Sequence, residues 1–177
     1  MKRILIAGFK QETGSFNPKP TVYDDFDVLT GQKMIDKTSG GYVGGALKVF
    51  DARDDIKVAG LPVAEAFFRA LDPDMTIEIL VEEGAQVSGG TDLMRLEGNA
   101  RAMLTAERAA LNTVQHLSGV ATMVSEYVRA MGHPECTLLD TRKTIPGLRH
   151  LEKYAVRMGG GANHRMGLWD AAMIKDN

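Results

Sequence analysis

The chain has 177 residues, of which 44% are hydrophobic and 25% are charged. This composition is typical of one globular domain, or one and a half, with a sizeable core. The 21 lysines and arginines against 23 aspartates and glutamates give a net charge of −2. This balance excludes the broad basic face that general nucleic-acid or membrane-surface binding needs, but it leaves room for a local anion pocket.

The opening segment MKRILIAGF has two basic residues and an apolar run that is too short for the core of a signal peptide. No stretch approaches the roughly eighteen apolar residues of a membrane span. Cys136 is the single cysteine and lies in an apolar run, so we expect a reducing compartment and a buried thiol. These features predict a cytoplasmic protein that does not enter a membrane.

The first third of the chain predicts short alternating elements. Residues 3–9 are predicted to form a buried strand, which a loop follows. After a Gly-rich turn, residues 46–54 are predicted to form a short helix and residues 56–60 the next strand. Residues 61–74 predict a clearer helix, because Pro62 suits its first turn and apolar residues recur at helical spacing. The predicted apolar stripe consists of Val63, Ala66, Phe67, Ala70 and Leu71.

The middle third predicts a small sheet and a long helical region. Residues 76–98 alternate between apolar and polar side chains and contain two turn signals, which indicates a small antiparallel sheet. Residues 99–131 are Ala-rich and favour helix. We expect that helix to be interrupted at Ser118 and Gly119 and to end at Gly132.

The last third predicts a repeating strand–helix–strand order. Residues 136–141 and 171–177 are predicted to form buried strands, and residues 146–161 a helix with a triple-glycine end. Together with the preceding helix, this order is typical of a βα-barrel or a parallel sheet, so the fold class is α/β. Chemistry in such folds gathers at the C-terminal ends of the strands, where Arg142 and Lys175 lie.

Cationic residues are concentrated near the end of the chain. Residues 138–177 contain nine side chains that are or can become cationic, and only four carboxylates. A charge directly after a buried strand costs free energy unless it meets an anion. Arg142 and Lys143 stand in that position: either they are solvated or ion-paired with Asp140 or Glu152, or they bind an anionic ligand.

Further cations lie beyond the three glycines 159–161. These glycines either end a helix or let the backbone approach a ligand beside His164 and Arg165. Lys175 either reaches solvent or faces a pocket, and Arg108, on a helix, taken alone indicates a surface residue. Arginine forks onto carboxylates and lysine serves phosphate as a point charge, so a shared pocket would take a small, multiply anionic ligand. The residues of that predicted pocket are Arg142, Lys143, His164, Arg165 and Lys175.

Several motifs resemble the quinolinate phosphoribosyltransferase family almost letter for letter. They are GLPVAEAFFRALDPD, LEGNARAMLTAERAALN, LSGVAT and LLDTRKTIPGLRHLEKYAVRMGGGANHRMGLWDAAMIKDN, and the match runs from about Val58 to Asn177. This family is also called nicotinate-nucleotide pyrophosphorylase (carboxylating). The glycosyltransferases of this family convert quinolinate and phosphoribosyl pyrophosphate into nicotinate mononucleotide, CO2 and pyrophosphate, assisted by Mg2+, in NAD biosynthesis.

The resemblance implies an α/β sandwich followed by an α/β barrel, assembled as a homodimer or a higher oligomer. On this basis, residues 57–110 are predicted to be the α+β sandwich portion and residues 111–177 the first part of a truncated α/β barrel. The family's later acidic residues, which hold ribose and Mg2+, have no counterpart in this sequence. Mg2+ is therefore implied as a cofactor, but its ligands are not in this chain.

The same resemblance implies which residues bind quinolinate. Arg142 in the motif DTRKT, together with His164 and Arg165 in NHRMG, would hold the two carboxylates. Thr141 would assist through its hydroxyl group or its backbone. The ligand set would thus combine two segments that are separated in the sequence.

The remaining roles concern catalysis and the neighbouring subunit. Lys143 and Lys175 would be the catalytic lysines, facing the anions of quinolinate and of phosphoribosyl pyrophosphate. Arg108 in TAER would enter the substrate site of the neighbouring subunit. The chemistry would be mainly electrostatic, with charge stabilised as pyrophosphate leaves and the carboxylate is lost.

Residues 1–56 instead resemble the N-terminal strand–loop–helix segment of microcystinase-C-like metallopeptidases, whose opening reads GFxHETNxF. Gln11 stands where that family has histidine, and Gly14 where it has asparagine. The chain is thus interpreted as a chimera, joined near the segment DDIKV. The alternative to an active phosphoribosyltransferase is a truncated or chimeric non-catalytic remnant that at most binds an anion or a partner chain. The positions that fit the metallopeptidase opening are Glu12, Thr13 and Phe16.

Overall fold

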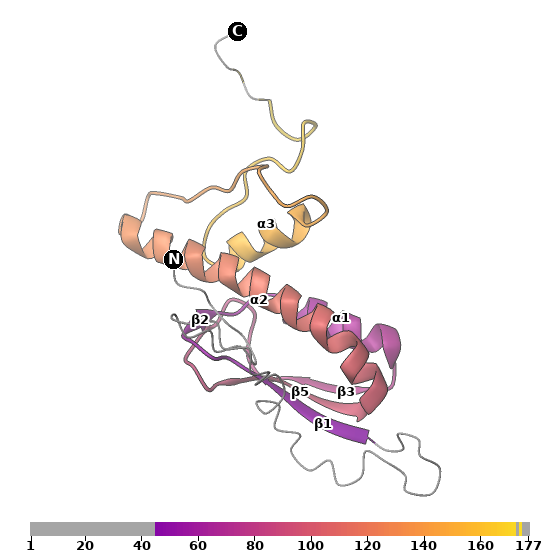
Figure 1. The fold of residues 1–177 in the computed structure, drawn as a ribbon. Coiled ribbons are helices and arrows are strands. Elements are labelled where there is room, and N and C mark those ends of the chain that lie inside the picture. The colour runs from indigo at the N-terminus through magenta and orange to yellow at the C-terminus, as the bar shows by residue number, and fades with distance from the viewer. Residues whose placement is uncertain (1–44, 173, 175–177) are drawn as a thin grey trace, which may run out of the picture.

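The computed structural model describes residues 45–172 and residue 174 (Figure 1). The strand and loop predicted before residue 45, and the opening that resembles the metallopeptidases, lie outside the described residues, as does Lys175. The described part is a mixed α/β fold with two small antiparallel sheets and three helices. Within it, no helix combines the length and apolar character that crossing a bilayer would require.

The larger sheet is antiparallel and has the strand order β1-β5-β3 (Figure 1). Its strands are β1 (Gly45–Asp51), β3 (Thr76–Ile79) and β5 (Asp92–Asn99). β2 (Ile56–Lys57) and β4 (Gln86–Val87) pair in the smaller sheet. The antiparallel sheet predicted within residues 76–98 is confirmed, and so is a strand beginning at residue 56.

The helix predicted for residues 46–54 is wrong, because β1 occupies most of this segment. β1 pairs with β5 from Gly45 opposite Asn99 to Asp51 opposite Asp92. Short apolar runs do not distinguish helix from strand by spacing alone, and here the cross-strand hydrogen bonds decide the conformation. The segment therefore contributes a strand to the sheet that supports the N-terminal half.

Helix α1 (Leu61–Leu71) confirms the predicted helix but turns a different face inward. Its buried residues are Leu61, Ala64 and Phe68, and the Phe68 ring meets that of Phe50 edge-on at 5.7 Å between centroids. Phe67 and Leu71 of the predicted stripe are 38% and 49% exposed. The helix is apolar on two faces, and spacing alone did not identify the one that packs.

The carboxylate of Glu83 caps α1 and also links it to the last helix, α3 (Arg149–Met158). Its two oxygens accept the Gly60 and Leu61 amides at 2.8 and 2.7 Å. The Tyr154 hydroxyl of α3 donates to the same carboxylate at 2.6 Å. Burial, with the hydrogen bond to Glu83 and its negative charge, raises the pKa of Tyr154 well above its usual range, so the hydroxyl keeps its proton.

Helix α2 (Ala100–Met131) is continuous, so the predicted interruption at Ser118 is wrong. The Ser118 hydroxyl accepts the Ala59 amide at 2.9 Å and donates to the Ala59 carbonyl at 3.1 Å. Its hydrogen bonds thus hold a neighbouring segment and do not compete with the helix. The predicted end is confirmed, since Gly132 caps α2 with a φ of 59°.

The core lies between the larger sheet and helices α1 and α2, which cover one of its faces (Figure 1). Buried side chains of β1, β5, α1 and α2 form this core, and the ion pair of Lys48 with Glu107 ties β1 to α2 within it. A second cluster joins α2 to α3 through Ala59, Leu117, Ala121 and Ala155. This second cluster determines where α3 stands.

The buried strands predicted for residues 136–141 and 171–177 are not observed in the described residues. The first segment has one isolated parallel bridge, Leu139 with Ala162, and most of its side chains are exposed. A parallel strand is buried when neighbours and helices cover it, which a single bridge does not achieve. Cys136, expected to be buried, is exposed.

Small residues let α3 end close against α2. A β-carbon on Gly159 would lie 2.5 Å from the Ala121 carbonyl oxygen and 2.6 Å from the Val124 β-carbon. The triple glycine thus ends a helix, and Gly159, the first of the three, leaves room for the backbone and side chains of α2. Gly119, inside α2, has no neighbour within 4 Å of such an atom.

We predict that Gly159→Ala lowers the free energy of unfolding by about 2 kcal/mol, because the backbone of α2 cannot move aside. The matched Gly119→Ala change should raise it by up to about 1 kcal/mol through helix propensity. Urea unfolding of both variants measures these effects. Wild-type stability of Gly159→Ala would contradict the tight α2–α3 contact.

Candidate anion-binding site

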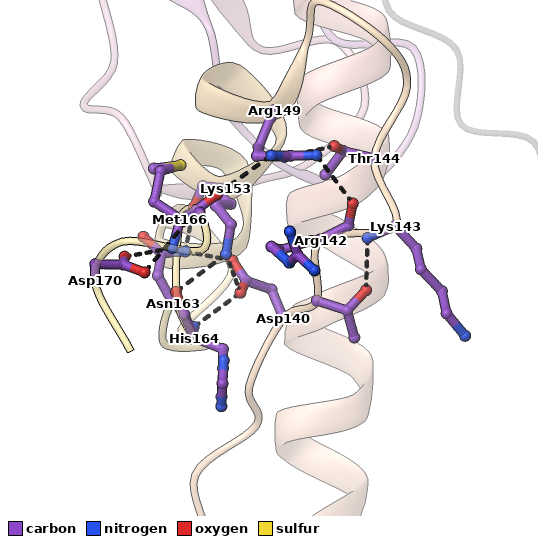
Figure 2. Close-up of polar contacts among 12 residues, drawn as sticks. Asp140, Arg142, Lys143, Thr144, Arg149, Lys153, Asn163, His164, Met166 and Asp170 are labelled. Atoms are coloured by element: carbon purple, nitrogen blue, oxygen red, sulfur yellow. Dashed lines mark hydrogen bonds and ion pairs between the residues drawn. The ribbon is translucent and has the colours of Figure 1, made fainter. Parts of the chain in front are cut away.

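Two loops meet beside α3, residues 138–144 and residues 162–166 (Figure 2). The Asp140 amide donates to the Ala162 carbonyl at 3.1 Å, and the Ala162 amide donates to the Leu138 carbonyl at 2.8 Å. These bonds form the parallel bridge between the loops. Segments that are distant in the sequence, each carrying predicted site residues, are thereby adjacent.

A buried ion pair lies between the two loops. Lys153 of α3 is 1% exposed, and its Nζ donates to Asp140 Oδ1 at 2.5 Å and to the His164 carbonyl at 3.1 Å. Asp140 also accepts the His164 amide at 2.8 Å and the Asn163 side-chain amide at 2.7 Å. Both Asp140 oxygens are therefore occupied by groups of α3 and of the second loop.

A second cation of α3 also bridges the loops. Arg149 Nη2 donates to the Arg142 carbonyl and Nη1 to the Met166 carbonyl, each at 3.3 Å. Its Nε donates to Thr144 Oγ1 at 3.2 Å. One guanidinium group thus contacts both loops (Figure 2).

The predicted residues of the first loop keep their side chains available. Thr141 is exposed and its hydroxyl accepts the Lys143 amide at 3.1 Å. Asp140 is paired with Lys153 and Glu152 with His116, so neither forms the ion pair considered for Arg142 and Lys143. Within residues 45–172, no ion pair or side-chain hydrogen bond engages the charged groups of Arg142 and Lys143. The Lys143 side chain extends away from the Asp140 network (Figure 2).

The second loop carries His164 and Arg165. The His164 side chain is exposed, whereas both backbone groups of this residue bind the Lys153–Asp140 pair. Arg165 is half-buried, and its Nη1 donates to the Ala171 carbonyl at 3.1 Å. The His164 imidazole is therefore exposed, while the backbone that carries it is held by hydrogen bonds.

The Asp170 carboxylate organises the turn that follows Arg165. Asp170 accepts the Met166 amide at 2.5 Å and the Gly167 amide at 3.3 Å. The hydrogen bond from Met166 lowers the pKa of Asp170 below its usual value. This carboxylate is thus engaged with backbone amides beside the site.

Arg108 is not brought to the two loops by the described structure. Arg108 is exposed on α2 and precedes His116, the α2 residue that contacts Glu152 of α3, by about 12 Å of helix axis. Lys175 lies outside the described residues. The structure therefore assembles Thr141, Arg142, Lys143, His164 and Arg165, on two adjoining loops.

The residues of the described chain do not fit the Mg2+ that the resemblance implies. No group of three or more histidine, cysteine, aspartate or glutamate side chains is placed to hold a metal ion in the part of the chain described. Near the loops, Asp140 and Asp170 already accept hydrogen bonds from protein groups. No residue described here is assigned to the metal.

Sequence reasoning did not identify Arg149 and Lys153, which hold the site together. Both lie on α3, one turn apart, and like charges at that spacing destabilise a helix. Two such cations are tolerated when each binds an acceptor outside the helix. The spacing of the two cations in the sequence could therefore have indicated that they bind other parts of the protein.

Comparisons with known proteins identify the family of the chain. The family described as "Quinolinate phosphoribosyl transferase, N-terminal domain" matches residues 45–118, and its C-terminal-domain counterpart matches residues 120–177. Together they span nearly all of the chain from residue 45 onward. The chain belongs to the quinolinate phosphoribosyltransferase family. The resemblance is confirmed, and the matched range begins at residue 45, ahead of the boundary expected at residue 57.

Individual relatives agree with the family assignment. A probable nicotinate-nucleotide pyrophosphorylase [carboxylating] from Synechocystis is 50% identical over 126 residues, which are 71% of this chain and 43% of the relative. The mitochondrial quinolinate phosphoribosyltransferase [decarboxylating] 2 of Nicotiana glauca is 47% identical over 189 aligned positions, covering 100% of this chain and 53% of the relative.

Solved structures are similar in fold as well as in sequence. NadC from Streptococcus pyogenes is 43% identical with a TM-score of 0.73, over 75% of this chain and 47% of that one. The nicotinate-nucleotide pyrophosphorylase from Francisella tularensis is 41% identical with a TM-score of 0.72, over 75% and 47%. The chain spans about half the length of the relatives it matches.

We predict that Lys153→Met lowers the free energy of unfolding by about 3–5 kcal/mol, because Asp140 is left buried without its cation. Lys153→Met combined with Asp140→Asn should recover at least half of that loss, since no unpaired charge remains. Urea unfolding measures both variants. Equal stability of the single and double variants would show that the pair is not a buried, coupled unit.

Proposed function

We propose that this chain acts in nicotinate-nucleotide formation, in which quinolinate and phosphoribosyl pyrophosphate give nicotinate mononucleotide, CO2 and pyrophosphate for NAD biosynthesis. Its own contribution is the binding of the quinolinate dianion. The observation that carries the proposal is that hydrogen bonds and an ion pair hold the two loops side by side. Arg142 and His164 project from them, while the nearby carboxylates Asp140 and Glu152 are paired elsewhere.

The proposed quinolinate ligands come from both loops. Arg142 and Arg165 bind carboxylate oxygens, because guanidinium groups form forked hydrogen bonds with carboxylates. His164 contributes an exposed imidazole, and Thr141 a hydroxyl group or its backbone. Two adjacent carboxylates on one ring suit cations that arrive from two adjoining loops.

The proposed catalytic groups are Lys143 and Lys175. Lys143 is exposed and extends away from the Asp140 network, which supports a role toward a second anion such as phosphoribosyl pyrophosphate (Figure 2). Arg108 acts in the site of a neighbouring subunit, in a homodimer or a higher oligomer. These cations stabilise charge as pyrophosphate leaves and the carboxylate is lost, and Mg2+ supplies further charge from ligands outside this chain.

The proposed architecture follows the order of the family's domains. Residues 57–110, with β1 added to their sheet, form the sandwich portion, and residues 111–177 begin an α/β barrel. We place the protein in the cytoplasm and propose no contact with nucleic acid. Several plant relatives are named as mitochondrial or chloroplastic, and those compartments are properties of the relatives.

A second candidate is a remnant that binds an anion or a partner chain without turnover. Large apolar side chains that follow the second loop in the sequence favour it, because Leu168, Trp169 and Ile174 are 72%, 82% and 94% exposed. Exposed apolar surface of this kind marks contacts with other chains. Release of CO2 from quinolinate, phosphoribosyl pyrophosphate and Mg2+ separates the two candidates, because the remnant releases none.

We predict that quinolinate binds the chain more tightly than nicotinate does, because nicotinate has one carboxylate and engages one loop. Arg142→Ala should weaken quinolinate binding by at least about tenfold, the usual effect of losing a charged hydrogen bond. Calorimetric titration measures both. Arg129→Ala, an exposed arginine in the last turn of α2, is the control. A folded chain that does not bind quinolinate would overturn the proposal.

A further inference from the structure

We propose that Arg149 and Lys153 are positioning residues that set the spacing of the two loops and thereby create the preference for a dianion. We call this pair the α3 clamp. The inference rests on the proposed quinolinate-binding function and names residues that the function itself does not assign. The clamp acts through the loops and does not touch the ligand.

Arg149 fixes the distance between the loops from one rigid group. Its three donors contact the carbonyls of Arg142 and Met166 and the hydroxyl of Thr144, at 3.2–3.3 Å. A guanidinium group is planar, so its donors hold these acceptors in a defined relative position. The acceptors include the backbone of Arg142 itself and the residue directly after Arg165.

Lys153 fixes the orientation of the second loop at His164. The His164 carbonyl accepts from Lys153 at 3.1 Å, and its amide donates to Asp140 at 2.8 Å. Both backbone groups of His164 are thus bound to one ion pair, which orients the bond to its side chain. Asn163 strengthens the arrangement by donating to Asp140 and to the Lys153 carbonyl, at 2.7 and 2.8 Å.

The two clamp cations are unsuited to bind an anion directly. Lys153 is 1% exposed and is neutralised by Asp140. Each Arg149 nitrogen that donates is directed at an internal acceptor. The cationic cluster therefore divides into groups that hold the loops and groups whose charged ends have no protein partner among the described residues, such as the half-buried Arg142 and the exposed Lys143.

Fixed spacing matters for a dianion more than for a monoanion. The two carboxylates of quinolinate are held at a set separation, so both loops must stand correctly before the ligand arrives. Preorganised groups bind more tightly because no further ordering is required on association. A monoanion needs one loop, and its affinity depends little on the separation between the two.

The test is Arg149→Lys, which keeps the charge and removes the fork. One ammonium group on a shorter-reaching stem does not hold all three acceptors together, so the loops lose their fixed spacing. We expect the dissociation constant for quinolinate to rise about tenfold, the effect of losing roughly 1.4 kcal/mol of hydrogen bonding. The constant for nicotinate should stay within about twofold. A purely structural loss would reduce both affinities in proportion and leave their ratio unchanged.

Arg157→Lys is the matched control on the same helix. Arg157 lies 5.9 Å from the centre of the Tyr154 ring and is exposed, and it has no hydrogen bond to either loop. Its replacement should leave both affinities as in the wild type. The same ratio in Arg149→Lys as in Arg157→Lys would overturn the clamp and leave the proposed function intact.

A second variant examines the other half of the clamp. Lys153→Met with Asp140→Asn removes the ion pair without leaving a buried charge. We expect this folded variant to lose its preference for quinolinate as Arg149→Lys does, and a retained preference would overturn the role of Lys153. If the wild-type chain binds neither compound, the proposed function fails, and the positioning role that rests on it fails as well.

Discussion

The ion pair of Lys153 with Asp140 is the constraint on which the candidate site depends. A lysine that is 1% exposed is tolerated only beside an anion with its other donors satisfied, and Asp140 and the His164 carbonyl meet that requirement. Because Asp140 lies on one loop and His164 on the other, satisfying the lysine draws the loops together. Arg142 and His164 are carried on the two loops whose backbone the pair holds together.

The rest of the fold serves to place α3, from which both clamp residues extend. Gly159 and Ala155 let α3 approach α2 closely, and the α2 backbone leaves no room for a larger residue at the first of these positions. Tyr154 binds the same Glu83 carboxylate that caps α1, so the start of one helix and the middle of another share one anion. Burial raises the pKa of this tyrosine, and the link therefore persists through the neutral range. The N-terminal sheet and its two helices are in this sense the support for α3.

Sequence patterns predicted the elements whose signals are local. The long helix and its glycine end were predictable from propensity and capping, and the sheet from alternation. The strand at residues 45–51 was missed because its partner lies far along the chain, at residues 92–99. The interruption expected at Ser118 was wrong because its hydroxyl binds the Ala59 backbone, a contact that no local rule anticipates. Long-range pairing decided the conformation in both cases.

The sequence predicted that cations gather at the site, but not which of them hold the loops and which remain available to a ligand. Which cations hold the loops and which remain without a protein partner depends on the acceptors around α3, and these are visible only in three dimensions. The central claim is that the loops are held in place before any ligand binds. Hydrogen exchange at the His164 amide in the ligand-free chain tests it most directly. We predict exchange as slow as that of amides inside α3, whereas exchange at the rate of an unprotected amide would contradict the account.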